Sequence, residues 1–115
     1  ISGWLYIQFS EIHMNFKTAT IALACLLSVP AWANMDLAKK NVCMACHNVD
    51  KKLVGPAYQD IAKKYAGQKD AAAHLAKSIQ AGGSGKWGPV PMPPQAALSD
   101  ADASILAIWI LAGAK

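Results

Sequence analysis

Two cysteines three residues apart, with a histidine directly after the second, constrain this chain more than any other feature. The motif reads Cys43-Met-Ala-Cys46-His47 within a sequence of 115 residues. Three chemistries use cysteines at this spacing: a dithiol–disulfide redox switch, one half of a zinc site, and the covalent attachment of haem. The choice among them decides how so short a chain folds and what it does.

The zinc and redox alternatives fit the surrounding sequence poorly. A zinc site needs four ligands, which commonly come from two such pairs. Here the fourth ligand would be His74 or a carboxylate, and the adjacent Cys46 and His47 point in different directions from a helix. A thioredoxin-like switch expects strands around the motif, whereas no alternating apolar pattern typical of strands is present. Both alternatives, and a plain structural disulfide, are less favoured than haem.

Covalent haem attachment accounts for every residue of the motif. Cysteines at i and i+3 lie on one face of a helical turn, so that both sulfurs can form thioethers with the vinyl groups of one porphyrin. The residue after the second cysteine is directed under the ring, where an imidazole nitrogen can bind the iron. The sequence therefore predicts one haem c, attached through Cys43 and Cys46 and ligated by His47.

The second axial ligand decides what the iron does. A methionine in this position gives an electron carrier, whereas an open position binds small ligands. Met92 is favoured, because it lies in the proline-rich stretch 89–94, where prolines restrict the backbone and would hold its thioether on a stiff loop. Met35 lies at the expected chain terminus, Met44 lies between the cysteines, and His74 lies on a segment where a solvated histidine is the default.

The first third of the chain predicts export. Residues 14–17 form a short basic start, residues 18–29 an apolar run, and residues 31–33 the small-x-small pattern Ala-Trp-Ala. Residues 14–33 are therefore predicted to be a secretory signal peptide, cleaved after the last of these alanines. The apolar run is shorter than the ~20 residues that a membrane span needs. Residues 1–13 precede a good initiator methionine and are interpreted as an upstream extension absent from the mature protein.

Processing would leave residues 34–115 as one all-α domain in the periplasm, without stable membrane insertion and with a monomer as the expected state. A chain this short buries a limited core, and a haem would supply a large apolar body for it to pack around. Beyond Ser104, the last helical segment is almost wholly apolar and predicts a buried helix, with Ser99 as its N-cap. The predicted helices are 36–46, 56–66, 70–81 and 99–112.

Several motifs together resemble the short bacterial class I cytochromes c of the c-551/c-552 type. Besides the cysteine motif, they are Val-Gly-Pro-Ala-Tyr at 54–58, Trp-Gly-Pro-Val-Pro-Met-Pro-Pro at 87–94, and Ile-Trp-Ile at 108–110. The resemblance implies an all-α cytochrome c fold, with about four short helices wrapped around one haem.

The resemblance also assigns roles to individual residues. It implies that His47 is the proximal and Met92 the distal iron ligand, and that the Pro56 carbonyl accepts a hydrogen bond from the other ring nitrogen of the histidine. It further implies that the Trp87 indole donates to a haem propionate.

Two positions depart from the family pattern. Gln95 lies where asparagine is common, three residues after the ligand methionine. Ser78 lies where a basic residue often meets a propionate. Both departures are expected to bear on the reduction potential and on propionate ionisation.

Charge indicates the kind of partner. All 11 basic residues are lysines and the formal net charge is +4, a balance that does not favour nucleic-acid binding. Lysine pairs at 39–40, 51–52 and 63–64 predict steering toward redox proteins with acidic docking surfaces, such as a terminal oxidase, a nitrite reductase or a peroxidase, and an upstream quinol-oxidising complex. The expected function is one-electron transfer between respiratory partners. The alternative is a haem-containing enzyme subunit or a gas sensor with a labile distal methionine.

Overall fold

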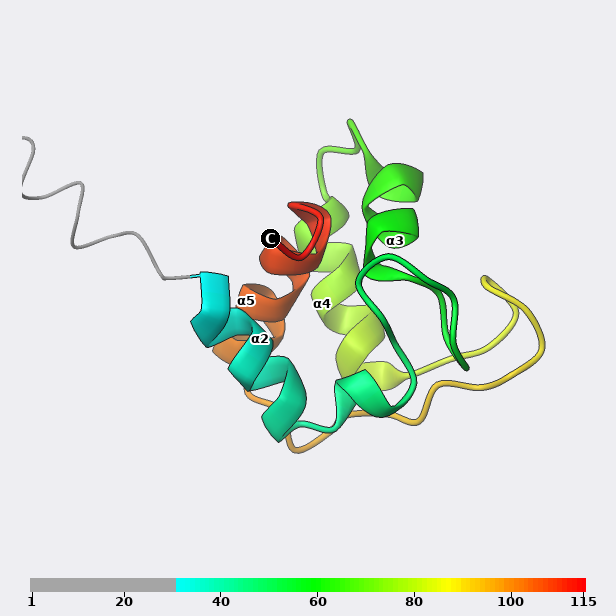
Figure 1. Cartoon of the computed structure of the whole chain (residues 1–115), viewed down its shortest axis with the longest axis horizontal. Helices are drawn as coiled ribbons and strands as arrows, with labels where there is room; N and C mark the ends of the chain where they lie inside the picture. Colours follow the sequence, from blue (N-terminus) through cyan, green and yellow to red (C-terminus); the bar gives the residue numbers. More distant parts are fainter. Residues whose placement is uncertain (1–30) are drawn as a thin grey trace, which may run out of the picture.

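The computed structural model describes residues 31–115, and the expectations for residues 1–30 lie outside this range. The described chain is helical, as Figure 1 shows, so the all-α prediction is confirmed. Its only strand-like feature in this range is an isolated antiparallel bridge between Gly83 and Met92. No helix in this range is long and apolar enough to cross a bilayer. The elements are α2 (Ala31–Lys40), the 3₁₀ turn η1 (Cys43–Ala45), α3 (Tyr58–Tyr65), α4 (Ala71–Ala81) and α5 (Asp100–Leu111).

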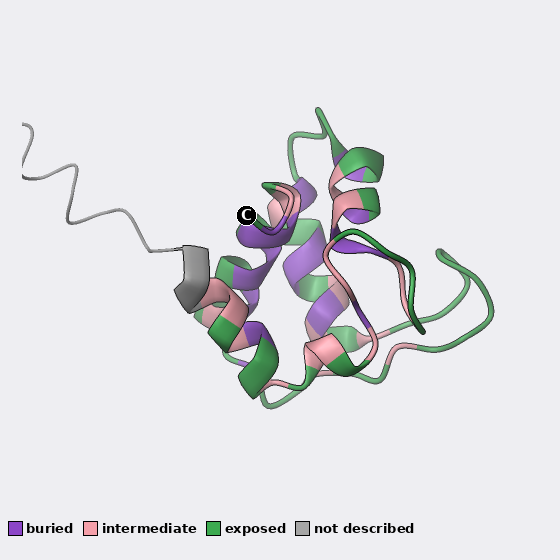
Figure 2. Ribbon diagram, in the orientation of Figure 1, coloured by how far each residue is buried: buried purple, intermediate pink, exposed green. Residues whose placement is uncertain are grey.

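Helix α5 is the centre of the fold, because α2, α3 and α4 all pack against it. Its buried residues recur at helical spacing and include Ala103 and Ala107, which are fully buried and let neighbouring helices approach closely. Figure 2 shows the buried faces of the helices turned toward one another. The expectation of a wholly buried last helix was wrong in one respect: Ile105 and Ile108 lie on its exposed side, and Ile108 is 60% exposed.

The ends of the later helices follow their sequence signals closely. Ser99 caps α5 as predicted, with its hydroxyl accepting a hydrogen bond from the Asp102 amide at 3.1 Å. Asp70 lies at the N-cap of α4, although its side chain makes no capping hydrogen bond. The predicted helix 56–66 is shorter than expected, because Pro56 precedes the N-cap residue Ala57 and lies outside α3.

The prediction of a single helix over 36–46 was wrong. Helix α2 ends at Lys40, and Val42 adopts a left-handed conformation with φ 62° before the 3₁₀ turn begins. A β-branched residue rarely adopts this conformation, so the break could not be expected from the residue type at this position. The break separates the cysteine-containing turn from α2, and the i, i+3 spacing of the cysteines is then accommodated by a 3₁₀ turn of three residues per turn.

We expect the substitution Ser99→Ala to lower the free energy of unfolding of the haem-loaded protein by about 1 kcal/mol, because the Asp102 amide loses its partner. Denaturant titration measures this value. Ser104→Ala is the matched control: the position is exposed within the same helix, where alanine is favourable. Equal losses in the two variants would contradict the role of Ser99 as a cap.

Candidate functional site

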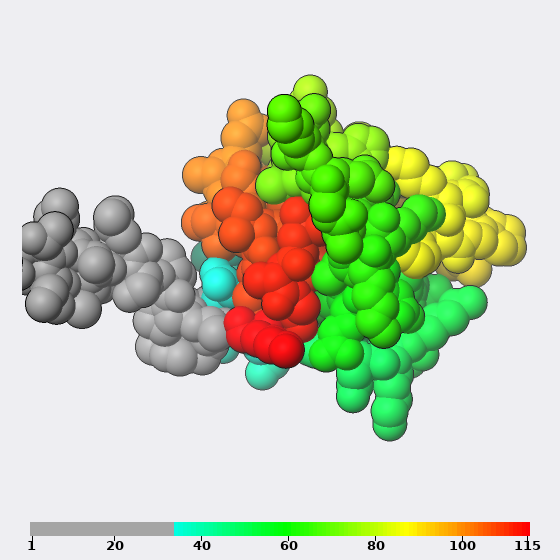
Figure 3. Space-filling model, turned by 90° about the horizontal axis from the view of Figure 1, so that it is seen from above, coloured from blue at the N-terminus to red at the C-terminus, as the bar shows by residue number. Residues whose placement is uncertain are grey.

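A cavity of about 300 Å³ lies between the cysteine motif, the 82–93 segment and the helices. Its volume lies at the lower end of the roughly 300–1,000 Å³ typical of cofactor and small-molecule sites. The loop near residue 50 and the segment near residue 85 project from the same side of the helices, also when seen from above (Figure 3). The apolar side chains that α3, α4 and α5 contribute to the lining are Ile61, Tyr65, Leu75, Ile79, Leu106 and Ile110.

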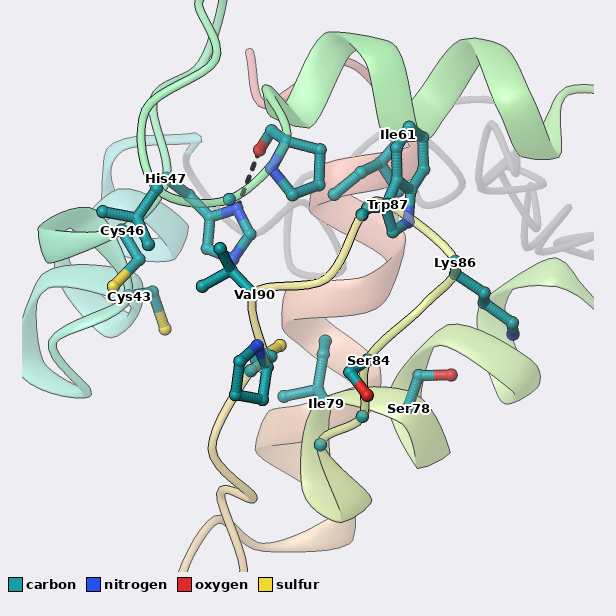
Figure 4. A pocket seen from close by; sticks show the side chains of 18 of the residues that line it. Cys43, Cys46, His47, Ile61, Ser78, Ile79, Ser84, Lys86, Trp87 and Val90 are labelled. Carbon is teal, nitrogen blue, oxygen red and sulfur yellow. Dashed lines mark hydrogen bonds between the residues drawn. The ribbon is translucent and has the colours of Figure 1, made fainter.

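His47 is held in one orientation by its hydrogen bond to the chain. Its Nδ1 donates to the Pro56 carbonyl at 2.8 Å, the contact marked in Figure 4. This is the hydrogen bond that the family resemblance implied, and it is confirmed. Because a carbonyl can only accept, Nδ1 carries the proton, and the opposite ring nitrogen, Nε2, is left with a lone pair for a metal. His47 is only 8% exposed.

Two further residues, whose roles sequence reasoning missed, fix the histidine ring. A Cβ on Gly55 would lie 2.6 Å from the Cε1 atom of His47, so only glycine leaves room for the imidazole here. The Tyr58 ring stacks on the imidazole with centroids 5.2 Å apart and planes at 17°. Burial raises the pKa of Tyr58 well above its ordinary range and so keeps the phenol neutral. The only sequence signal was the stretch 54–58 itself, quoted as part of the family resemblance.

Cys43 and Cys46 both line the cavity and are free of any disulfide. Burial raises the pKa of the Cys43 thiol and so favours a neutral sulfur. A thioether sulfur is neutral, whereas zinc binding and thiol–disulfide exchange both require the thiolate. Within residues 31–115, moreover, no three His, Cys, Asp or Glu residues come together as a metal site. The surroundings of Cys43 therefore suit a neutral sulfur, such as that of a thioether, better than a thiolate.

Met92 is placed by its backbone. Its amide donates to the Gly83 carbonyl at 2.7 Å, and its carbonyl accepts from the Gly83 amide at 3.1 Å. Gly82 has φ +65°, and a Cβ there would lie 2.5 Å from the Met92 carbonyl oxygen, so the loop approaches the end of α4 as closely as glycine permits.

Of the candidates considered for the second axial ligand, only Met92 contributes to the cavity lining. Met35, Met44 and His74 do not line it. All three methionines pack against the hydrophobic core, so it is the cavity lining that distinguishes Met92.

The remaining residues singled out from the sequence fall into two groups. Trp87 and Ser78 line the cavity, although the Ser78 hydroxyl donates to the His74 carbonyl of its own helix at 3.0 Å. Gln95 does not line the cavity, and its side-chain amide donates to the Pro93 carbonyl at 3.4 Å. In this structure the Gln95 side chain therefore acts within its own loop.

The sequence matches the cytochrome c family over residues 35–113. The chain belongs to the cytochrome c family. It is 58% identical over 90 residues to cytochrome c-552 of Nitrosomonas europaea, covering 78% of this chain and 87% of that protein. It is 60% identical over 95 residues to cytochrome c-552 of Hydrogenobacter thermophilus, covering 83% and 95%. The crystal structure of wild-type Nitrosomonas europaea cytochrome c552 superposes with a TM-score of 0.66 at 60% identity, covering 68% of this chain and 96% of that one.

The family settles the cofactor and the class of function. The chain is a small class I cytochrome c with one covalently bound haem c, and it is an electron-transfer protein rather than an enzyme. The cavity fits such a group: it is lined mainly by apolar side chains, and two cysteine sulfurs, a proton-free imidazole nitrogen and a thioether all belong to residues that line it.

We expect Gly55→Ala to displace the His47 ring, because the added methyl group would lie 2.6 Å from Cε1. Overpacking of this kind typically costs about 1–3 kcal/mol. The measurement is the free energy of unfolding of the haem-loaded protein, together with its absorption spectrum. Val54→Ala is the control, since the neighbouring valine is exposed. A Gly55→Ala protein as stable as the control, with an unchanged spectrum, would contradict the close fit.

Proposed function

We propose that the chain is an exported monohaem carrier of single electrons between respiratory redox proteins, with its haem attached through Cys43 and Cys46 and its iron ligated by His47 and Met92. The observation that carries this proposal is that the cysteine motif and Met92, which are far apart in sequence, line one apolar cavity. When bound, the haem supplies a one-electron iron couple, whose potential is raised by methionine ligation and by apolar burial.

The chain contributes rigidity to both proposed ligands. The hydrogen bond to Pro56 holds the imidazole of His47 in place and increases the basicity of Nε2. The two-way backbone bridge to Gly83 holds the segment that carries Met92. Ligands fixed in this way keep their positions in both oxidation states, so little of the protein rearranges during electron transfer.

Export is proposed from the sequence pattern. Residues 14–33 would be removed as a signal peptide, leaving a mature domain of residues 34–115 in the periplasm, where thioether attachment takes place in bacteria. The expected cleavage point after Ala33 falls within α2 of the uncleaved chain. Mass spectrometry of the exported protein tests the whole proposal: we expect a chain that starts at Asn34 and carries the added mass of one haem. Colourless material with no added mass would overturn it.

The charge of the residues at the cavity mouth favours a partner with an acidic docking surface. Lys52 and Lys86 contribute to the lining, and no aspartate or glutamate does. Val54 and Val90 also line the cavity and are 51% and 57% exposed. An apolar centre flanked by positive charge suits a redox protein with a complementary acidic rim, since opposite charges accelerate encounter and orient the two proteins.

We expect Met92→Ala to abolish the long-wavelength sulfur-to-iron absorption band and to lower the reduction potential, because the iron loses a thioether ligand. The fall is on the order of 0.1 V, within the ~0.8 V range over which axial ligands set haem potentials. Optical spectroscopy and voltammetry measure the two effects. Met44→Ala is the control, since Met44 packs on the core outside the cavity. An intact band in Met92→Ala would remove this methionine from the iron.

We expect Lys52→Gln to slow electron transfer to an acidic redox partner by about two- to five-fold at low ionic strength, because one attractive charge is lost at the cavity mouth. The difference should vanish near 1 M salt, where charges are screened beyond ~3 Å. Stopped-flow kinetics provides the rates. Lys39→Gln is the control, since Lys39 is an exposed lysine on α2 that does not line the cavity. Equal effects of the two substitutions would contradict docking at this mouth.

A further inference from the structure

The segment of residues 83–88 (the rim segment) has little packing of its own, although it borders the cavity. Its three glycines, Gly83, Gly85 and Gly88, all have positive φ, and a Cβ on any of them would meet no atom within 4 Å. One internal turn, from the Gly85 amide to the Gly88 carbonyl at 2.9 Å, closes its tip. In Figure 1 this part of the chain projects away from the helices. Apart from the backbone bridge between Gly83 and Met92, its position therefore depends on contacts made by its side chains and carbonyls.

Two helices supply such contacts. From α3, the Lys64 ammonium donates to the Lys86 carbonyl at 3.2 Å and lies 4.3 Å from the centre of the Trp87 ring. From α4, His74 Nε2 pairs with the Lys86 ammonium at 2.7 Å. Figure 4 shows the Lys86 side chain directed away from Cys43 and His47. These contacts involve two adjacent residues, Lys86 and Trp87, and both line the cavity.

We propose that Lys64 and His74 are positioning residues, which together keep the rim segment and its Trp87 at the mouth of the haem cavity. In this proposal the contact made by His74 depends on pH. The inference rests on the haem site proposed above. Neither residue touches the cavity itself, so both act through Lys86 and Trp87.

The pH dependence follows from the hydrogen-bonding capacity of the pair. A lysine ammonium can only donate, so His74 Nε2 accepts and carries no proton in this contact. A histidine side chain ordinarily gains its second proton between about pH 5 and 8. Once Nε2 is protonated, two cations face each other and the hydrogen bond is lost. The contact is therefore present while the His74 imidazole is neutral and is lost once the imidazole is protonated.

The other charged and titratable groups around His74 do not replace the lost contact. The Tyr65 ring of α3 lies 5.8 Å from the imidazole, centre to centre. On α4, Asp70 and Lys77 are one helical turn away, and Lys64 reaches the carbonyl of Lys86 from α3. Lysines outnumber the single carboxylate, so a protonated His74 stands in mainly positive surroundings, which favours release of Lys86.

The test follows the rim segment by NMR in the reduced, haem-loaded protein. The readouts are the Trp87 indole N–H resonance and the amide exchange of residues 83–88, corrected for intrinsic exchange, as pH is varied. In the unsubstituted protein we expect both to change with pH together with the His74 ring resonances, with several-fold faster exchange at the acidic end. Absence of this transition would overturn the proposal.

Two substitutions at the pair separate the pH effect from a structural one. His74→Gln places a neutral acceptor near Lys86 at every pH, so we expect slow exchange throughout and no transition. Lys86→Met removes the donor, so we expect fast exchange throughout and no transition. If the pH transition persists in His74→Gln, it belongs to another group, and the role of His74 is overturned.

The role of Lys64 has its own matched control. Lys64→Met keeps the aliphatic stem but removes the charge, and we expect several-fold faster exchange in residues 83–88 at all pH values. Lys63→Met should leave the segment unchanged, since Lys63 faces Asp60 at 4.0 Å instead. Equal effects of the two substitutions would overturn the role of Lys64. Haem content, measured on every sample, keeps the inferences distinct: samples that lack haem contradict the proposed function, whereas loaded samples with unaltered exchange contradict only the positioning roles.

Discussion

The hydrogen bond from His47 Nδ1 to the Pro56 carbonyl is the interaction on which the rest of the site depends. It ties the cysteine-containing turn to the residues that lead into α3, and it decides which ring nitrogen is free for a metal. Backbone contacts reinforce the same junction: the Gly55 amide donates to the Cys46 carbonyl at 2.7 Å, and the Tyr58 amide to the Asn48 carbonyl at 3.0 Å. The loop between the motif and α3 is thus closed on itself, with the imidazole inside it.

The protein core explains why the cavity and the fold belong together. Many of the buried core residues are alanines, and Leu106 is the largest side chain that is fully buried. Small buried side chains let helices approach closely but remove little apolar surface from water, and short chains are marginal for this reason. The cavity lies beside this core, since Leu106 and Ile110 of α5 contribute to both. A covalently attached haem therefore completes the apolar interior as well as supplying the redox centre.

The features that could be predicted from the sequence are those that depend on residues close to one another in the chain. Attachment through Cys43 and Cys46, the choice of Met92 and the cap at Ser99 were all inferred from residue chemistry within a few positions. The structure shows the cap, and Cys43, Cys46 and Met92 all line the cavity. The break at Val42 did not follow, because a left-handed valine contradicts its local preference. The steric requirement at Gly55 was also missed, because it depends on an imidazole brought close by the fold. The requirement at Gly55 is thus set by a tertiary contact, which the local sequence does not reveal.

The two sides of the cavity differ in how firmly they are held. The proposed ligands are fixed by backbone hydrogen bonds and buried contacts. The rim segment beyond Gly83 is held mainly by exposed side chains, whose individual interactions are weak in water. Lys86 belongs to both the rim and the positive cavity mouth. An acidic partner would attract the same ammonium that His74 binds, so the partner and His74 would compete for Lys86. Binding of such a partner and protonation of His74 would then be linked, because each favours a Lys86 that is free of the imidazole.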